Sequence, residues 1–470
     1  MDIRGRFATG MALLANWALH RAGRQGSTVP GRVGLKLDPG LLGKLAATVD
    51  EGVVVVCGTN GKTTTNNMIY QALKAQGKRV AGNLEGANML PGVTAALAKS
   101  AGASGSRHVD WACLEVDEFS APRIVPQVKP TFLVLLDLFR DQLDRYGEID
   151  IVIDRLIETV KAAENLTVIY NADDPLCARV AKQAPNQVAF GVDQDLNLPH
   201  DLVVEGRFCL ECGHLLSYRY RQYGQLGDWY CEKCGNARPA LDFAARDVYF
   251  GELATDPLRF SVTGPSEQAG SLAPLPTPPA SSTVALSTSR RGAYMLYNIM
   301  AAWAASCLAG AKPESFQRML AANQTSKGRM EGFTVDGVPV VVNLAKNPTG
   351  FNQNIGVCLR DPRKKAVVFI VNSQVNDGHD ISWLWDVDYE RLAAAGTSLW
   401  YAGGERRNDL QVRLKYAGIP AKLSEDTAAS VKDAIARGAE AVYVLPNYSA
   451  LVPARDAVAA IAQESEMSAR

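Results

Sequence analysis

A strand–loop–helix segment near residue 58 constrains the fold of this chain more than any other feature. Residues 51–57 are apolar and mostly β-branched, which is typical of a strand buried on both faces of a parallel sheet. The loop Gly58–Thr65 follows directly and leads into a predicted helix over residues 66–76. Because glycines let backbone N–H groups surround an anion and a helix N-terminus adds its dipole, the segment predicts a nucleotide-phosphate site.

The residue types inside the loop specify the chemistry further. The loop reads Gly58, Thr59, Asn60, Gly61, Lys62, Thr63, Thr64 and Thr65. We expect the Lys62 ammonium to neutralise the β- and γ-phosphate oxygens, and a hydroxyl of Thr63 or Thr64 to bind Mg²⁺. The strict eight-residue phosphate loop has a further glycine where this chain has Val56, so the match is to a shorter variant. The alternative, a strand–helix turn with a solvated lysine, is disfavoured by the flanking elements.

The 470 residues are expected to form two or three domains, because they exceed one ordinary core. Apolar runs alternate with helical stretches in two regions, which indicates α/β domains with parallel sheets. A helix is expected from Tyr294 to Ala309, and the Pro-, Ser- and Thr-rich residues 264–289 predict an extended loop. Strands are expected at residues 51–57, 110–116, 130–136, 166–170 and 188–190, and again at 338–343, 365–371, 398–401 and 441–445.

Charge and hydropathy exclude several classes of function. The chain has 49 Lys plus Arg and 49 Asp plus Glu, so it lacks the basic excess of a general nucleic-acid binder. No apolar run reaches the length of a membrane-spanning helix. Residues 1–23 resemble a signal sequence, but Asn16, His20 and Arg21 interrupt the apolar run. We therefore predict an amphipathic helix that rests on a partner, on the parent domain or on a membrane surface.

Four of the nine cysteines form two Cys-x-x-Cys knuckles, and each knuckle is followed by a glycine that permits a tight turn. The four cysteines are Cys209, Cys212, Cys231 and Cys234. This spacing predicts a zinc ribbon, and four thiolates leave no open position, so the zinc is expected to be structural. A disulfide pair or a redox dithiol is disfavoured because nothing indicates secretion. The other five cysteines lie in apolar or helical contexts, which indicates a reducing, cytoplasmic location.

The loop Gly-Thr-x-Gly-Lys-Thr-Thr resembles that of the Mur ligase family, which includes amino-acid-adding enzymes of peptidoglycan synthesis and folylpolyglutamate synthase. The resemblance implies a central ATP-binding parallel-sheet domain and a C-terminal α/β domain. It also implies that Glu115 binds Mg²⁺, that Asn298 contacts the nucleotide and that Arg329 closes on it at the domain junction. Four further motifs resemble those of the family and occur in the same order along the chain, at residues 114–118, 171–175, 297–302 and 328–331.

Departures from ordinary Mur ligases resemble one subfamily, MurT, the Mur-ligase-like subunits of lipid II isoglutaminyl synthase. Gln142 and Lys346 replace histidines of the ordinary enzymes, and Asp137 replaces an asparagine, so the resemblance leaves open whether the second metal site of those enzymes is present. The subfamily also has a zinc ribbon inserted in its central domain. The matching segments are residues 85–89, 139–150, 343–348, 382–386 and 445–448, within a resemblance that runs from about residue 35 to 451.

The acidic loop Asp377-Gly-His-Asp380 reads by itself as a turn, because Asp and Gly are common turn formers. The resemblance implies that Asp380 completes a Cys–His–Asp triad whose other members lie on a glutaminase partner, GatD, in a heterodimer. Asp377 is the alternative for that role. His379 is read as a turn residue, because no thiol or serine close by in the sequence supports a self-contained nucleophile.

The function that the resemblance implies is ATP-dependent amidation of the D-glutamate α-carboxylate of lipid II through an acyl phosphate, with ammonia from GatD. Lys62, Glu115 and Asp380 are the expected catalytic residues, and ATP, Mg²⁺ and structural Zn²⁺ the expected cofactors. The alternatives are a conventional Mur or folylpolyglutamate ligase and a non-catalytic ATP-binding scaffold. A peripheral position at the inner face of the membrane would suit lipid II. The expected domains are residues 1–34 (helical), 35–328 (central), 205–240 (inserted ribbon) and 329–470 (C-terminal, contacting the glutaminase).

Overall fold

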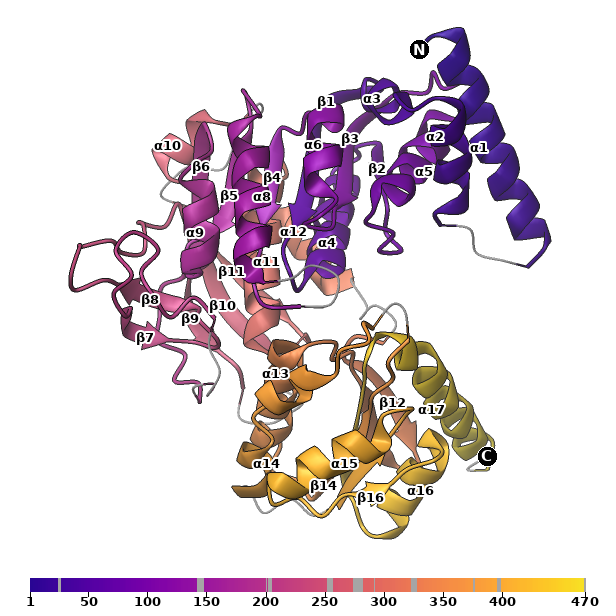
Figure 1. The fold of residues 1–470 in the computed structure, drawn as a ribbon, viewed down its shortest axis with the longest axis vertical. Coiled ribbons are helices and arrows are strands. Elements are labelled where there is room, and N and C mark those ends of the chain that lie inside the picture. The colour runs from indigo at the N-terminus through magenta and orange to yellow at the C-terminus, as the bar shows by residue number, and fades with distance from the viewer. Residues whose placement is uncertain are drawn as a thin grey trace.

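A nine-stranded sheet organises the first two thirds of the chain (Figure 1). The computed structural model describes residues 1–23, 27–141, 148–199, 201, 205–251, 257–273, 282–290, 292–322, 328–374, 377–394 and 399–468. Neighbouring strands from β2 to β9 are parallel, and β10 and β11 extend the sheet antiparallel. In spatial order the strands are β11 (Thr283–Thr288), β10 (Leu258–Thr263), β9 (Phe243–Tyr249), β6 (Asn186–Val192), β5 (Thr167–Asn171), β4 (Phe132–Leu135), β1 (Val49–Cys57), β3 (Val109–Glu115) and β2 (Val80–Gly82).

Helices cover both faces of this sheet because its central strands are apolar on both sides. Along β1, Val54 and Val56 belong to one core, whereas Val53 and Val55 belong to the other. The period of two along a strand requires this division, and it confirms the predicted doubly buried strand. The first face carries α4 (Lys62–Ala75), α11 (Ala293–Leu308) and α12 (Pro313–Ala322). The second carries α3 (Leu41–Ala46), α5 (Leu90–Ala101), α6 (Ala121–Val128), α8 (Ile149–Lys161) and α9 (Pro175–Ala181).

The prediction of an extended loop over residues 264–289 is wrong for its described parts. Helix α10 (Glu267–Ser271) and strand β11 lie within that range, and β11 forms the outer edge of the sheet. In β11 only Leu286 and Thr288 are buried, so an edge strand rich in Ser and Thr resembles a linker in composition. Residues 274–281 of the predicted loop lie outside the described residues. The predicted helix over residues 294–309 is confirmed as α11.

The cysteine-rich insertion projects from the side of the sheet as a small hairpin (Figure 1). Its strands β7 (Ser217–Arg221) and β8 (Gly227–Tyr230) pair antiparallel. Trp229 attaches the hairpin to the sheet, because its indole Nε1–H donates to Ala172 O at 3.0 Å just after β5.

A six-stranded sheet forms the C-terminal domain, with helices on both faces (Figure 1). All four strands that the sequence predicts there are present. Helices α13, α14 and α15 cover one face and α16 and α17 the other. The strands, in spatial order, are β12 (Glu331–Val335), β13 (Val338–Val342), β17 (Ala441–Pro446), β14 (Lys365–Ile370), β15 (Leu399–Gly403) and β16 (Lys422–Leu423). The helices are α13 (Pro348–Arg360), η1 (Ser382–Asp386), α14 (Glu390–Ala394), α15 (Arg407–Tyr416), α16 (Thr427–Ala436) and α17 (Tyr448–Ser468).

The N-terminal helix is present as α1 (Ile3–Arg21), and α2 (Val29–Leu37) follows it. Asp2 caps α1 by accepting from Gly5 N at 2.8 Å. The face of α1 that packs on the protein carries the small residues Ala8, Thr9 and Ala12. Ile3, Phe7, Leu14 and Trp17 are exposed, so this helix packs on its parent domain mainly through small residues, whereas an ordinary amphipathic helix buries its large apolar side chains. None of the described helices is long and apolar enough to cross a bilayer.

Candidate functional site

The predicted phosphate loop lies between β1 and α4, and the segment after β4 supports it. Gly58 has a positive φ of 128°, and a Cβ there would lie 3.0 Å from Asp137 O. Thr59 N donates to Asp137 O at 2.9 Å, and Asn60 N donates to Asp137 Oδ1 at 2.8 Å. The two strands β1 and β4 are neighbours, so their carboxyl ends bring Gly58 and Asp137 together.

Asp137 is buried at 7 % exposure, and burial raises its pKa to about 8, with the hydrogen bond from Asn60 N opposing the shift. Because the unfolded carboxyl ionises near pH 4, the folded state holds the extra proton between about pH 4 and pH 8. Stability therefore falls as the pH rises through that window and levels off above it.

Replacing Asp137 by asparagine is expected to flatten this pH dependence. The amide keeps an oxygen that can accept from Asn60 N but cannot ionise, so the variant should gain more than about 1 kcal/mol over the parent chain near pH 8. The unfolding midpoint of both nucleotide-free proteins should be measured from pH 5 to pH 9. Equal slopes for the two proteins would show that Asp137 is already ionised at pH 5.

Lys62 is folded back over its own loop and paired with an acid that sequence reasoning missed. Its Nζ lies 3.1 Å from Glu118 Oε1 and also donates to Gly58 O and to Thr59 O. Lys62 and Glu118 are 8 % and 9 % exposed. Burial raises the pKa of Glu118, and the Lys62 ammonium opposes that shift. The ammonium therefore has a buried carboxylate partner in place of phosphate oxygens.

Glu115, Thr63 and Gly86 form a cradle that fits a hard cation. Glu115 Oε1 accepts from Asn88 Nδ2 at 3.0 Å, whereas its Oε2 is buried and has no hydrogen-bond partner in the described part of the chain. A Cβ on Gly86 would lie 3.5 Å from Thr63 Oγ1 and 3.7 Å from Glu115 Oε2. The two predicted magnesium ligands therefore face the same small space, and an unpartnered carboxylate oxygen beside a hydroxyl suits Mg²⁺. Of the two threonines considered, the geometry favours Thr63 over Thr64.

Asn298 contacts the loop, whereas Arg329 lies at the start of the C-terminal domain. Asn298, on α11, backs the loop directly, because a Cβ on Gly61 would lie 2.0 Å from its Oδ1. Only glycine fits there, and the φ of 81° at Gly61 requires glycine as well. Arg329 lies half-exposed at the start of the C-terminal domain, and its charge partly opposes the rise that burial causes in the pKa of Tyr294.

The C-terminal domain touches the phosphate loop through the segment 343–348. Asn347 Nδ2 donates to Asn60 Oδ1 at 3.1 Å, and Lys346 Nζ lies 2.5 Å from Asp141 Oδ2. Lys346 thus forms an ion pair where the ordinary enzymes have histidine. Gln142, the other histidine replacement, lies outside the described residues.

Asp380 lies at the same junction. Its Oδ1 accepts from Ser382 N at 2.8 Å. Asp377 instead uses both carboxylate oxygens inside the domain, accepting from Ser449 N at 2.9 Å and from Gln374 N at 3.1 Å. A pocket joins both aspartates to the loop-contacting segment, and it is lined by Arg140, Asp141, Lys346, Asn347, Pro348, Asp377, Asp380 and Trp383.

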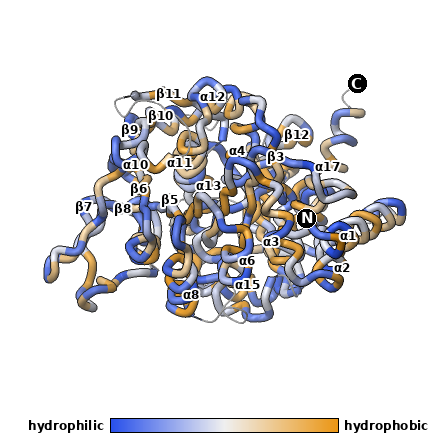
Figure 2. Tube along the Cα trace, turned by 90° about the horizontal axis from the view of Figure 1, so that it is seen from above, coloured by the Kyte–Doolittle hydropathy of each residue, from blue (hydrophilic) through white to orange (hydrophobic). Residues whose placement is uncertain are grey.

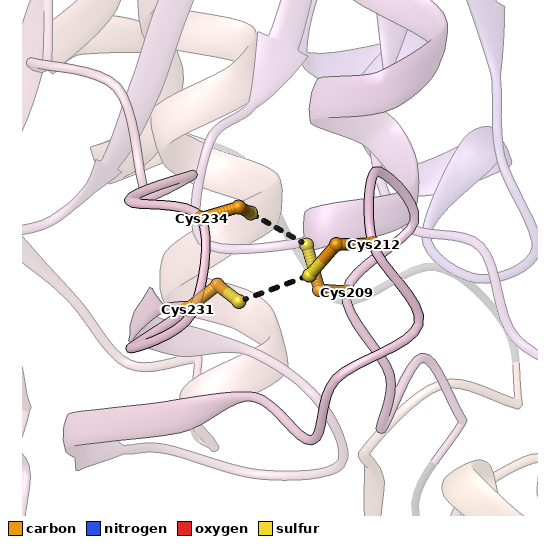
Figure 3. A group of neighbouring side chains, drawn as sticks. All are labelled: Cys209, Cys212, Cys231 and Cys234. Atoms are coloured by element: carbon orange, nitrogen blue, oxygen red, sulfur yellow. Dashed lines mark hydrogen bonds between the residues drawn. The ribbon is translucent and has the colours of Figure 1, made fainter.

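The four predicted zinc ligands converge in the ribbon (Figure 3). Their Sγ atoms all lie within 4.8 Å of one another, and Cys209 Sγ is 3.5 Å from Cys234 Sγ. Thiolates around a tetrahedral zinc would be roughly 3.8 Å apart, so the cluster has the size of a zinc site. Burial raises the pKa of Cys209, but N–H groups of Glu211 and Cys212 lower it by a larger amount, whereas, against the hydrogen bond from Asn236 N, burial and the neighbouring thiols raise the pKa of Cys234.

Two family models and several known proteins match this chain. Residues 56–205 match the family model "Mur ligase middle domain", and residues 344–451 match "MurT ligase C-terminal". The chain is 31 % identical over 95 % of its length, and 96 % of the relative's, to the subunit MurT of lipid II isoglutaminyl synthase from Staphylococcus aureus (strain COL). It is 31 % identical over 96 % of its length, and 97 % of the relative's, to the Streptococcus pneumoniae R6 subunit of that name.

The chain belongs to the MurT family. The crystal structure of MurF ligase from Thermotoga maritima in complex with ADP has the same fold, with a TM-score of 0.64, 17 % identity, and coverage of 93 % of this chain and 85 % of that one. Family membership makes the chain an ATP-dependent ligase by class and confirms the predicted Mur-ligase-type α/β fold.

The ribbon is attached through the motif at residues 171–175. Asp173 is fully buried and accepts from Arg238 of the ribbon at 2.8 Å and from the Tyr297 hydroxyl at 2.6 Å. Asp174 caps α9 and accepts from Leu138 N at 2.9 Å. In this chain the two aspartates therefore join the ribbon, α11 and the support of the phosphate loop.

Sequence reasoning named most of this cluster but missed two members. Glu118 lies within the family-like segment 114–118, and its place three residues after a strand-end glutamate is the signal that could indicate a partner for Lys62. Asn347 stood within 343–348 in the same way. Its contact with Asn60 joins residues 287 positions apart, and no local pattern signals such a pair.

Proposed function

We propose that this chain uses ATP to activate the α-carboxylate of D-glutamate in the lipid II stem peptide, and that ammonia then converts it to D-isoglutamine. The observation that carries the proposal is the loop-centred cluster of Lys62, Thr63 and Glu115 in a chain of the MurT family. The carboxylate oxygen attacks the γ-phosphorus, the bond to the β-phosphate oxygen breaks, and ADP leaves. Ammonia attacks the resulting acyl phosphate, phosphate leaves and a proton is lost.

The roles of the chain's own residues follow from their positions. Backbone N–H groups of the loop bind phosphate oxygens, and Lys62 exchanges Glu118 for the β- and γ-oxygens when nucleotide enters. Glu115 and Thr63 would hold Mg²⁺, which supplies charge neutralisation at the phosphates. Arg329 and the segment around Lys346 lie on the second domain, so that closure of the two domains would orient the acceptor and exclude water.

The acceptor is proposed to be ammonia because Lys346 forms an ion pair at a position where histidine stands in amino-acid-adding relatives. A glutaminase subunit of the GatD type would produce this ammonia, since the named relatives are subunits of a glutamine-hydrolysing enzyme. Asp380 is the better candidate than Asp377 to orient a histidine of that subunit. Asp377 already accepts hydrogen bonds from Ser449, whereas Asp380 accepts a turn hydrogen bond from Ser382 N.

The variant Asp380→Asn is expected to lower glutamine hydrolysis by the complex about 10³- to 10⁴-fold, because an asparagine favours the wrong histidine tautomer. ATP binding by the chain should stay the same, since Asp380 does not contact the loop in the described structure. Glutamate release and nucleotide affinity measure the two effects separately. Asp377→Asn is the matched control, and its main effect should be on thermal stability through Ser449. Full hydrolysis by Asp380→Asn would contradict the shared triad.

One assay distinguishes amidation from its rivals. The purified chain and its glutaminase partner are mixed with ATP, Mg²⁺, glutamine and lipid II, and the lipid product is weighed by mass spectrometry. Exchange of OH for NH₂ in the stem supports amidation. Addition of a whole amino-acid residue would instead assign a conventional Mur or folylpolyglutamate-type ligase. A chain that binds ATP but turns over none under any of these conditions would be a scaffold.

A further inference from the structure

The outer face of α1 carries a stripe of large apolar side chains with no protein packed on it in the described structure. Ile3, Phe7, Leu14 and Trp17 are 87 %, 61 %, 53 % and 58 % exposed. Spacings of four, seven and three residues place them along one face of the helix. Four neighbouring large apolar residues exposed on one helix are unusual for a surface that meets only water.

The inner face of α1 explains why these residues point outward. Ala8 and Ala12 meet α2 at Gly34, where an added Cβ would lie 3.4 Å from the Ala12 Cβ. This close approach leaves no room for large side chains between the helices. Small residues therefore anchor the helix, and the large side chains of the stripe remain accessible to another surface.

The charges around the stripe indicate which kind of surface the stripe contacts. Residues 1–37 contain six Lys or Arg but a single acid, in a chain whose overall formal charge is zero. The acid, Asp2, is held by Lys44 Nζ at 2.8 Å and by Gly5 N. The described basic residues Arg4, Arg6, Arg21, Arg32 and Lys36 are all exposed. A second copy of the chain would bring like charges together, whereas an anionic surface would neutralise them.

We propose that α1 docks this protein on an anionic lipid bilayer, with Phe7, Leu14 and Trp17 in the interface and Arg6 and Arg21 at the headgroups. A helix that combines an apolar face containing Trp, Phe and Leu with flanking arginines lies in the plane of a membrane interface. Arg21 stacks over the Trp17 ring at 5.6 Å, which holds a cation at the edge of the stripe.

The position of α1 in the molecule allows this contact. Figure 1 shows the helix along the outer edge of the central domain, away from the C-terminal domain. Figure 2, seen from above, shows it standing out from the body with apolar segments along its length. Docking through α1 places the contact on the side of the central domain away from the C-terminal domain, and it does not depend on which bond the active site forms.

Sedimentation of the full chain with vesicles tests the proposal. Vesicles of phosphatidylglycerol and phosphatidylcholine should bind the protein, and vesicles of phosphatidylcholine alone should bind it far less. Arg6→Gln with Arg21→Gln should weaken binding about 25-fold, since each arginine near an anionic surface contributes roughly fivefold. Phe7→Ser with Trp17→Ser should weaken it at least as much. Binding should also fall as ionic strength rises.

A charge-matched control is Lys161→Gln with Lys312→Gln, two exposed lysines far along the chain from α1, and it should bind as the parent does. Equal binding to both vesicles, no binding, or equal loss in the control would overturn the proposal. Self-association in sedimentation velocity that the Phe7 and Trp17 changes abolish would assign the stripe to a second copy and overturn it too. All variants alter exposed residues, so their unfolding midpoints should equal that of the parent chain. A lower unfolding midpoint for the serine variant would show that the stripe stabilises the fold.

Discussion

Replacing Lys62 by methionine should lower the rate of ATP-dependent amidation by about a hundred- to a thousandfold. The ammonium is the phosphate loop's only side-chain cation in the sequence Gly58–Thr65, and charge neutralisation of the transferred phosphoryl group depends on it. Glutamine hydrolysis by the partner should be affected less, because Lys62 lies on the central domain. ATP-dependent product formation and glutamate release, measured in the same reaction, check both expectations.

The buried pair with Glu118 requires a control for this experiment. Removing Lys62 alone leaves a carboxylate at 9 % exposure without its ammonium, which costs stability as well as activity. The double variant Lys62→Met with Glu118→Gln removes both charges, so it should recover the unfolding midpoint but not the activity. Recovery of activity in the double variant would show that Lys62 acts through folding and not on phosphate.

Removing the zinc ligands should have the largest effect on stability. Cys212→Ser with Cys234→Ser is expected to abolish zinc binding and to destabilise the central domain by several kcal/mol, because a structural zinc contributes folding free energy directly. Loss of the ribbon also withdraws Arg238 from Asp173, which leaves a fully buried carboxylate without its guanidinium. Bound zinc by elemental analysis and the thermal midpoint measure the two effects.

Loss of the zinc ligands should also affect the nucleotide site. Gln225 Nε2 of the insertion donates to Leu138 O at 2.8 Å, and Leu138 follows the Asp137 that holds Asn60. ATP affinity should therefore fall in the same variant. A strong chelator should destabilise the parent chain but have no further effect on the double-serine variant, since Cys234 is exposed and Cys212 partly so. A parent chain that contains no zinc and ignores the chelator would contradict the metal site.

Much of the fold could be predicted because its signals are local. The doubly apolar run of β1, the glycines of the loop and the paired cysteines each require a particular conformation within a few residues. Strand β11 could not be recognised in the same way. Only Leu286 and Thr288 of its six residues are buried, and its pairing with β10 depends on a neighbour that the sequence does not point to.

The candidate site shows the same limit. The positions of Glu115 and Lys62 beside the loop could be predicted, because Glu115 ends a strand and Lys62 lies in a phosphate-loop motif. Glu118 and Asn347 act by meeting residues far along the chain, and only the packed structure brings those atoms together. The role of Asp173 at the base of the ribbon depends on three elements that the motif itself does not contain.

The hydrogen bond between Asn347 and Asn60 links the conformation of the C-terminal domain to that of the phosphate loop. Asn60 lies in the phosphate loop, and Asn347 caps α13 of the C-terminal domain through Gly350 N. A nucleotide that shifts the loop would therefore change this contact at the start of α13, and a proposed partner subunit bound to the C-terminal domain would change the same contact at the loop. By linkage, the factor by which ATP changes the affinity for the proposed glutaminase equals the factor by which that glutaminase changes the affinity for ATP.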